Sequence, residues 1–226
     1  MLYYHYWSGG FRRFIWFLLG FILIAVLVVL DETAGFDRTV INIVQSMESP
    51  GLTALAKSLS LVGSSKLAVG ISLLTIAILF FILKHRMELV LFLWVGIGSQ
   101  LLNTLLKLWF HRERPNIHRL IEQAGYSFPS GHSMAAFSLY GVIAYLLWRH
   151  MRNRRERLLL ILFTVLMTGG IGWSRIYLGV HYPSDVIGGY AASGAWLMLS
   201  AACFEAYRNA RGRKPVIPRK NADPRK

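Results

Sequence analysis

The chain has 226 residues, of which 54% are hydrophobic and 16% charged, and its mean hydropathy is positive. Because so few charged residues cannot cover the surface of a soluble globular domain, this composition excludes that class and indicates an integral membrane protein. The single cysteine, Cys203, lies in an apolar stretch, so the sequence offers neither a disulfide framework nor a cysteine-based metal site.

Six apolar stretches approach or reach the length of about 17 to 25 residues that a helix needs to cross a bilayer. They lie at 14–30, 67–83, 89–106, 133–148, 157–173 and 186–204. The first stretch follows Arg12 and Arg13, as a secretory signal would, but it is long and no small-residue cleavage site follows it. We therefore predict an all-α polytopic membrane protein with six transmembrane helices, the first of them retained.

The segment between the first two stretches, residues 36–63, has its own helical pattern. Apolar residues recur at helical spacing on both sides of a break at Pro50 and Gly51. This pattern predicts two short amphipathic helices at the membrane surface. They would either shape an entrance for lipid or pack against the bundle.

The distribution of basic residues predicts the orientation. With six spans, most of the 25 lysine and arginine residues fall on the side that also holds both termini. Lysine and arginine concentrate in cytoplasmic segments, so we expect cytoplasmic termini and an extracytoplasmic position for the opposite loops and the short helices. The net charge of +14 then reflects topology and contact with anionic headgroups, and we expect no nucleic-acid partner. The sequence leaves the oligomeric state open.

Two regions follow from this pattern. Residues 1–208 form a six-helix membrane domain, and residues 209–226 form a basic cytoplasmic tail. Only about the last dozen residues have the polar, proline-containing composition of a disordered end.

Three short polar blocks lie just outside the predicted spans, all on the side opposite the termini. They are KLWFHRERP at 107–115, SFPSGH at 127–132 and WSRIYLGVHYPSD at 173–185. At the ends of spans, a membrane protein can gather charged groups into an anion site without burying them in hydrocarbon. Together the blocks indicate phosphate chemistry at a membrane surface.

Cations from three separate places can enclose one phosphate group. Lys107, Arg114 and Arg175 lie at such positions, and a mixture of planar guanidinium forks and a compact ammonium suits oxygens that point in several directions. For Arg112 and Arg119 we expect only side chains that extend along the membrane interface.

The middle block predicts a turn that leads into the fourth span. Gly131 allows the backbone to approach a phosphate closely, and the first N–H groups of the helix can donate to its oxygens. Ser130 adds a hydroxyl donor, and His132 in the first turn can deliver a proton to a leaving group. By itself this block indicates only a turn with a capping serine.

The last block holds a histidine and an aspartate four residues apart. Pro183 suits a helix start, and around such a start the side chains of His181 and Asp185 come within hydrogen-bonding reach. A carboxylate bonded to one imidazole nitrogen leaves the other nitrogen free as a nucleophile. A capping aspartate beside an interfacial histidine is the structural alternative.

Taken together, the blocks resemble the three-part signature of the type 2 phosphatidic acid phosphatase superfamily. The resemblance is carried by Lys107-x6-Arg114-Pro115, Pro129-Ser130-Gly131-His132 and Ser174-Arg175-x5-His181-x3-Asp185, which match every position in order. Within that superfamily the chain is similar to small bacterial enzymes that act on phosphatidylglycerol phosphate or undecaprenyl pyrophosphate. The plasma membrane of a bacterium is therefore the expected location.

The resemblance implies a two-step reaction with no cofactor and no metal. His181, oriented by Asp185, would attack phosphorus, and His132 would protonate the leaving group. The phosphoryl oxygens would be held by Lys107, Arg114, Ser130, Gly131 and Arg175. Independently, the blocks contain only Asp185 and Glu113 as hard ligands, too few for a dedicated Mg²⁺ or Ca²⁺ site. The remaining histidines have no partners comparable to Asp185, and we expect them in loops or at the interface: His5, His85, His111, His118 and His150.

These patterns are compatible with four hypotheses about the function. The first is a lipid phosphatase acting on undecaprenyl pyrophosphate, phosphatidylglycerol phosphate or phosphatidic acid, with the first of these as the leading candidate. The second is a phosphotransferase that uses a lipid diphosphate as donor. A vanadate-dependent haloperoxidase shares the signature, but six spans argue against a soluble enzyme of that kind. The last is a protein that binds or carries anionic lipids without catalysis.

Overall fold

The computed structural model describes residues 2–116 and 118–212, and every regular element in these ranges is a helix. The elements are α1 (Leu2–Val29), α2 (Ala34–Ser46), α3 (Pro50–Val62), α4 (Ser65–Ala77), the π-helical turn η1 (Ile78–Ile82), α5 (Arg86–Phe110), α6 (Gly131–Trp148), α7 (Arg154–Tyr177) and α8 (Pro183–Gly212). Five of the six predicted apolar stretches each fall on one long helix, and the stretch 67–83 falls on α4 and η1 together, so the predicted all-α fold is confirmed. Most of these helices extend beyond the apolar stretches because polar residues continue the helix toward the interface.

Within residues 2–116 and 118–212, five helical segments are long and apolar enough to cross a membrane. They are Gly9–Val29, Ser65–Ile82, Arg86–Phe110, Arg154–Tyr177 and Pro183–Arg211. Helix α6, which covers the predicted span 133–148, is not among them. It packs against α5, α7 and α8, and it buries Ser133 and Ser138, the latter bonded to Ser99 of α5 at 2.8 Å. A helix enclosed by protein needs less apolar surface, so α6 as a sixth crossing stays a prediction.

The long helices bury one set of apolar side chains against each other and expose another set around the outside. A core cluster joins Leu91 and Val95 of α5, Val142 of α6 and Leu197 of α8. Large apolar side chains such as Leu101 remain exposed on the outer faces. A bundle surrounded by hydrocarbon has no reason to hide such residues, which fits a membrane protein.

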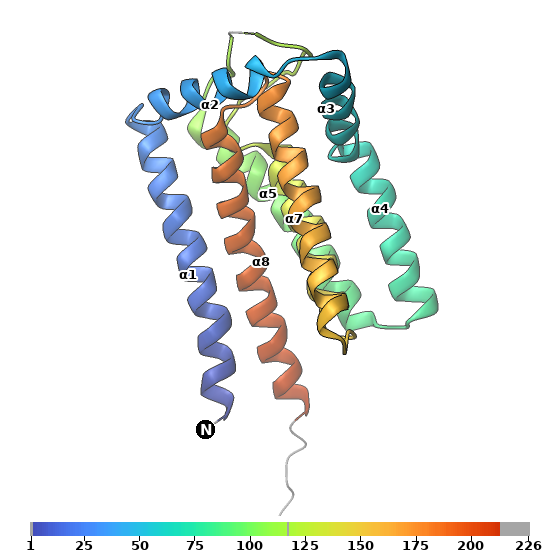
Figure 1. The fold of residues 1–226 in the computed structure, drawn as a ribbon. Coiled ribbons are helices and arrows are strands. Elements are labelled where there is room, and N and C mark those ends of the chain that lie inside the picture. Colours follow the sequence, from blue (N-terminus) through green and yellow to red (C-terminus); the bar gives the residue numbers. More distant parts are fainter. Residues whose placement is uncertain (1, 117, 213–226) are drawn as a thin grey trace, which may run out of the picture.

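The two predicted amphipathic helices are confirmed as α2 and α3. After the break between them, Ser49 caps the start of α3. Its hydroxyl accepts a hydrogen bond from the Leu52 N–H at 3.4 Å, and Pro50 occupies the first helical position. Both helices lie over the same end of the bundle (Figure 1). Ile41 and Val44 of α2 and Ala56 of α3 enter a core with the end of α7, so these helices pack against the bundle.

The two ends of the bundle differ in what they carry. Figure 1 shows α2, α3 and the segments 111–116 and 118–130 at one end, whereas α1 begins and α8 ends at the other end. The turns between η1 and α5 and between α6 and α7 also lie at this second end. Helix α8 continues to Gly212, past the predicted boundary at 208, and the rest of the predicted tail, 213–226, lies outside the described residues.

Candidate active site

The three polar blocks meet at the α2 and α3 end of the bundle, around a pocket of about 410 Å³. Five of the eight predicted site residues line it, namely Lys107, Arg114, Gly131, His132 and His181. They come from the last turn of α5, the loop that follows it, the first turn of α6 and the loop before α8. Ser130, Arg175 and Asp185 lie behind this lining, each almost fully buried.

His181 and Asp185 lie together, as their spacing indicated. Helix α8 begins at Pro183, and the Nδ1 atom of His181 lies 3.3 Å from the Oδ2 atom of Asp185. The same oxygen accepts the Tyr182 N–H at 2.8 Å and the hydroxyl of Ser127. Because the carboxylate is fixed by several donors, it can hold the imidazole in one orientation.

Arg114 determines which nitrogen of His181 carries the proton. Its Nη1 atom lies 3.0 Å from the Nε2 atom of His181, and a guanidinium can only donate. Nε2 must therefore accept, which leaves the proton on Nδ1, facing Asp185. The lone pair of Nε2 therefore faces Arg114. His181 also borders the pocket, which a nucleophile requires.

Burial keeps His181 neutral. It lowers the pKa of the imidazole to about 4, although the Asp185 carboxylate acts in the opposite direction. A histidine with this pKa is uncharged near neutral pH and can attack phosphorus without first losing a proton.

Arg114, Lys107 and Arg175 differ in how many of their hydrogen-bond donors are already used within the protein. All five N–H groups of Arg114 donate within the protein, to Ala124 O, Gly125 O, Tyr126 O, Val180 O and His181 Nε2. Lys107 donates to Tyr126 O at 2.8 Å. Arg175 donates to the hydroxyl of Ser60 and, at 2.7 Å, to Oε1 of Gln123, while its buried Nε has no hydrogen-bond partner among the described residues.

The turn before α6 has the predicted form, and its serine acts as the helix cap. Ser130 Oγ accepts from the Ser133 N–H at 3.4 Å and from the Ser133 hydroxyl at 3.0 Å. Gly131 borders the pocket beside Asn103, whose Oδ1 would lie 3.1 Å from a Cβ atom at position 131. The small residue therefore lets the helix start lie directly at the pocket wall.

A second glycine shapes the segment that carries His181. Gly179 has φ +72°, and a Cβ atom there would lie 1.9 Å from the carbonyl oxygen of His118. Only glycine fits this turn between the end of α7 and His181. The turn directs the chain back so that Val180 O can accept from Arg114 at 2.8 Å.

The expectation for Arg112 was wrong. Its side chain does not extend along the interface but points inward, where Nη1 donates to Asp185 Oδ1 at 2.7 Å and Nη2 to Asp37 Oδ2 at 2.9 Å. Asp37 also accepts from the backbone and hydroxyl of Ser184, at 2.8 and 2.6 Å. Arg112 turned inward because two buried carboxylates need a cation between them.

This network supplies site residues that the sequence did not identify. Ser127 lies within the SFPSGH block, so its position was a usable signal, whereas Asp37 of α2 had none. Counting Asp37 and Asp185 against Lys107, Arg112, Arg114 and Arg175, the site holds two carboxylates and four cations. The excess of two positive charges matches a phosphate dianion.

The expectation that the remaining histidines lack partners was also wrong for three of them. His118 Nε2 lies 2.8 Å from Glu48 Oε2, and His85 Nδ1 lies 2.9 Å from Glu88 Oε2, which His150 also approaches. Glu48 and Glu88 went unnoticed because the first is remote in sequence from its histidine and the second lies outside the motif blocks. Arg119 also differs from expectation, since its side chain folds back onto its own loop and its Nε donates to Pro115 O at 2.5 Å.

Comparison with known proteins gives consistent matches. A model described as PAP2 superfamily matches residues 88–209. Over 175 residues the chain is 31% identical to phosphatidylglycerophosphatase B of Bacillus subtilis strain 168, covering 76% of this chain and 85% of that protein. A crystal structure described as the first transmembrane PAP2 type phosphatidylglycerolphosphate phosphatase from Bacillus subtilis has a TM-score of 0.80 and 28% identity, covering 86% of this chain and 96% of that chain. A shorter match at 35% identity over 98 residues covers 41% of this chain and 46% of undecaprenyl-diphosphatase BcrC of the same Bacillus strain.

Proposed function

This chain is a member of the PAP2 superfamily, and we propose that it is a membrane lipid phosphatase that forms a phosphohistidine on His181. The family assignment agrees with the three motif blocks quoted from the sequence. The observation that best supports the proposed chemistry is the hydrogen-bond chain from Asp185 through His181 to Arg114, because it leaves the acceptor nitrogen at the pocket.

In the first step, the lone pair of His181 Nε2 forms a bond to phosphorus while the bond from phosphorus to the lipid oxygen breaks. Phosphate oxygens take over the Nη1 donor that Arg114 gives to Nε2 in the free enzyme, so substrate binding itself releases the nucleophile. The phosphorylated imidazolium keeps its Nδ1 proton, and Asp185 compensates the positive charge.

His132 handles the proton on the leaving side. It lines the same pocket, where burial and the nearby cations lower its pKa to about 3. A bound phosphate dianion acts in the opposite direction and favours the protonated form. The proton passes to the lipid oxygen as the bond breaks, and neutral His132 then accepts a proton from water. Water attacks phosphorus, the bond to His181 breaks, and inorganic phosphate leaves.

The cations stabilise the charge that develops on the phosphoryl oxygens. Lys107 and Arg175 approach from α5 and α7, and the N–H groups at the start of α6 donate next to Gly131. Ser130 acts mainly by capping α6, so its contribution is to hold that helix start in place. No step requires a metal ion.

The shape of the pocket supports a lipid as substrate. Its wall continues along α5 through Gln100, Thr104 and Leu108, which lie one turn apart on an exposed face, over a rise of about 12 Å. Ser65 at the start of α4 forms the other side. A phosphate group can therefore occupy the site while its acyl or prenyl chain leaves sideways into the bilayer.

Among lipid substrates, the 175-residue match to phosphatidylglycerophosphatase B favours phosphatidylglycerol phosphate as the first to test, ahead of undecaprenyl pyrophosphate and phosphatidic acid. The distribution of lysine and arginine supports cytoplasmic termini and an extracytoplasmic site. Reporter fusions near Ser49 and near Arg152 should then report opposite sides of the membrane.

The direct test is phosphate release from these three lipids and a short soluble ester, in detergent and in the presence of chelator. We expect the lipids to be hydrolysed far more efficiently than the soluble ester, and labelled phosphate to be trapped on the wild type but not on His181→Ala. His118→Ala is the matched control, since this exposed histidine bonds a glutamate outside the pocket. Transfer of phosphate to an added acceptor lipid instead of water would identify a phosphotransferase and refute hydrolysis.

A further inference from the structure

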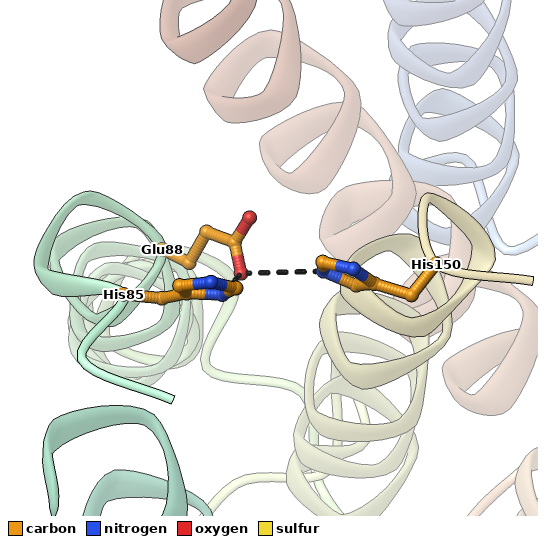
Figure 2. A group of neighbouring side chains, drawn as sticks. All are labelled: His85, Glu88 and His150. Carbon is orange, nitrogen blue, oxygen red and sulfur yellow. Dashed lines mark hydrogen bonds and ion pairs between the residues drawn. The ribbon is translucent and has the colours of Figure 1, made fainter. Parts of the chain in front are cut away.

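A second group of chemically active side chains lies at the opposite end of the bundle. His85 immediately precedes α5, Glu88 lies in its first turn, and His150 follows the end of α6 (Figure 2). Lys84, with φ +56°, ends the segment that follows η1 and turns the chain into α5. The phosphatase mechanism uses none of these residues.

The three donor atoms converge on one point. Glu88 Oε2 lies 2.9 Å from His85 Nδ1 and 3.8 Å from His150 Nε2, and the ligand atoms of the three residues all lie within 4.8 Å of one another. Figure 2 shows the carboxylate between the two rings, which are stacked with centroids 5.5 Å apart and an interplanar angle of 19°. Around a tetrahedral zinc ion with bonds of about 2.0 to 2.2 Å, neighbouring ligand atoms are about 3.4 Å apart, so the two distances bracket the required value.

The donor types also select the kind of metal. Two imidazole nitrogens and one carboxylate oxygen suit Zn²⁺ and related transition metals, whereas Mg²⁺ and Ca²⁺ prefer oxygen ligands alone. The His85 and His150 side chains are 39% and 52% exposed, so solvent can reach the centre and supply a fourth ligand.

The surroundings hold the carboxylate without closing the site. Arg149 Nη1 lies 3.8 Å from Glu88 Oε1 and 3.9 Å from Glu205 Oε1, so this cation faces the other oxygen and is itself balanced by Glu205. Such a neighbour orients a ligating carboxylate, but its charge weakens the binding of a divalent ion. A site of moderate affinity follows.

We propose that His85, Glu88 and His150 form a Zn²⁺ site that joins the turn between η1 and α5 to the end of α6. The ion replaces the hydrogen bond between His85 and Glu88 and binds the two turns together. The simpler alternative is a hydrogen-bonded pair with a neighbouring histidine and no affinity for metal, and it makes the opposite prediction in a binding experiment.

The test is titration of the purified full chain, without a polyhistidine tag, with Zn²⁺ and with Co²⁺ in detergent. We expect one ion per chain, an intense visible Co²⁺ spectrum typical of tetrahedral coordination, and a higher Tm with Zn²⁺. His85→Ala, Glu88→Gln and His150→Ala should each weaken Zn²⁺ binding by at least about tenfold and abolish the Tm increase. His118→Ala, which removes a histidine paired with Glu48 at the other end, should bind Zn²⁺ as the wild type does.

Lipid phosphate release by metal-free samples shows that each variant is folded, because the residues that line the phosphatase pocket lie at the other end of α5 and α6. If one of the three variants is inactive, Zn²⁺ binding by the other two variants and the Co²⁺ spectrum of the wild type still test the proposed site. The proposal is overturned if Zn²⁺ does not bind to active wild-type protein, or if binding is unchanged in active variants of these residues.

Discussion

The two ends of this bundle use the same local arrangement in different surroundings. At one end His181 lies just before α8 with Asp185 in the first turn, and at the other end His85 lies just before α5 with Glu88 in the first turn. His181 and Asp185 are 1% and 0% exposed, with cations on the pocket side, whereas the His85 side chain is 39% exposed and a second histidine faces its carboxylate. The proposed nucleophile and the proposed metal ligand therefore differ in burial and in neighbours more than in spacing.

The two ends should differ most in how kcat responds when the histidine is removed. We expect His181→Ala to lower kcat for lipid phosphate hydrolysis by about 10⁴-fold or more, because the proposed mechanism takes the attacking lone pair from this residue. His85→Ala should leave kcat near the wild-type value. Phosphate release by the two variants measures the difference, and a His181→Ala protein with near-normal turnover would exclude His181 as the nucleophile.

Asp185→Asn tests whether orientation of the imidazole matters as well as its presence. An amide at this position mispairs with Nδ1–H. The corresponding Asp-to-Asn change in the catalytic triad of serine proteases lowers kcat by roughly 10⁴-fold, and we expect a loss approaching that size. The corresponding Glu88→Gln change should leave kcat unchanged. Equal kcat in Asp185→Asn and the wild type would contradict the orienting role.

Arg112 links the buried end to α2, and its removal should have the next largest effect. Arg112→Gln leaves Asp185 and Asp37 without their shared cation, which costs about 3 to 5 kcal/mol where a buried pair is broken. We expect a lower Tm and a fall in kcat larger than any change in KM, because Asp185 loses its fixed position. Arg38→Gln, an exposed arginine on the same helix α2, serves as the control and should change neither quantity.

The sequence predicted those parts of this arrangement that depend on local pattern. The apolar stretches and the break at Pro50 indicated the helices, and the three blocks contained all eight candidate residues. Asp37 could not be predicted, because its contact with Ser184 joins helices that are remote in sequence. Arg112 lay inside a block, yet its direction depends on carboxylates that only the folded chain places beside it.

The second end was missed for a similar reason. His85 and Glu88 have helical i,i+3 spacing, which occurs often by chance, and His150 joins them only when α5 and α6 pack together. Neither stretch resembles a known ligand motif. A histidine between long apolar segments is therefore better judged by what packs beside it than by its sequence neighbours.

Gly131 tests the pocket wall at the buried end with a smaller change. In Gly131→Ala the new Cβ atom would lie 3.1 Å from Asn103 Oδ1, so either the start of α6 or Asn103 must move by a few tenths of an ångström. We expect a fall in kcat/KM of roughly tenfold, carried by weaker phosphate contacts, with little change in Tm. Gly125→Ala is a poor control because of its positive φ, whereas Gly35→Ala, with open space around the new atom, is suitable. Unchanged kcat/KM in Gly131→Ala would argue against a close backbone contact with phosphate.

The pH dependence of stability tests the burial of His181 directly. The pKa of His181 is about 4 in the folded protein, whereas an unfolded chain has an ordinary histidine pKa of about 6.5. Between these values the unfolded chain binds a proton that the folded protein does not. Stability from this residue is therefore fully retained above about pH 6.5, falls as the pH drops toward 4, and changes no further below that.

Thermal unfolding across this window should show a shallower decline in Tm for His181→Gln than for the wild type. His118→Gln, which changes an exposed histidine, should keep the wild-type slope, and an equal slope in His181→Gln would show that His181 titrates normally and is not held neutral by burial.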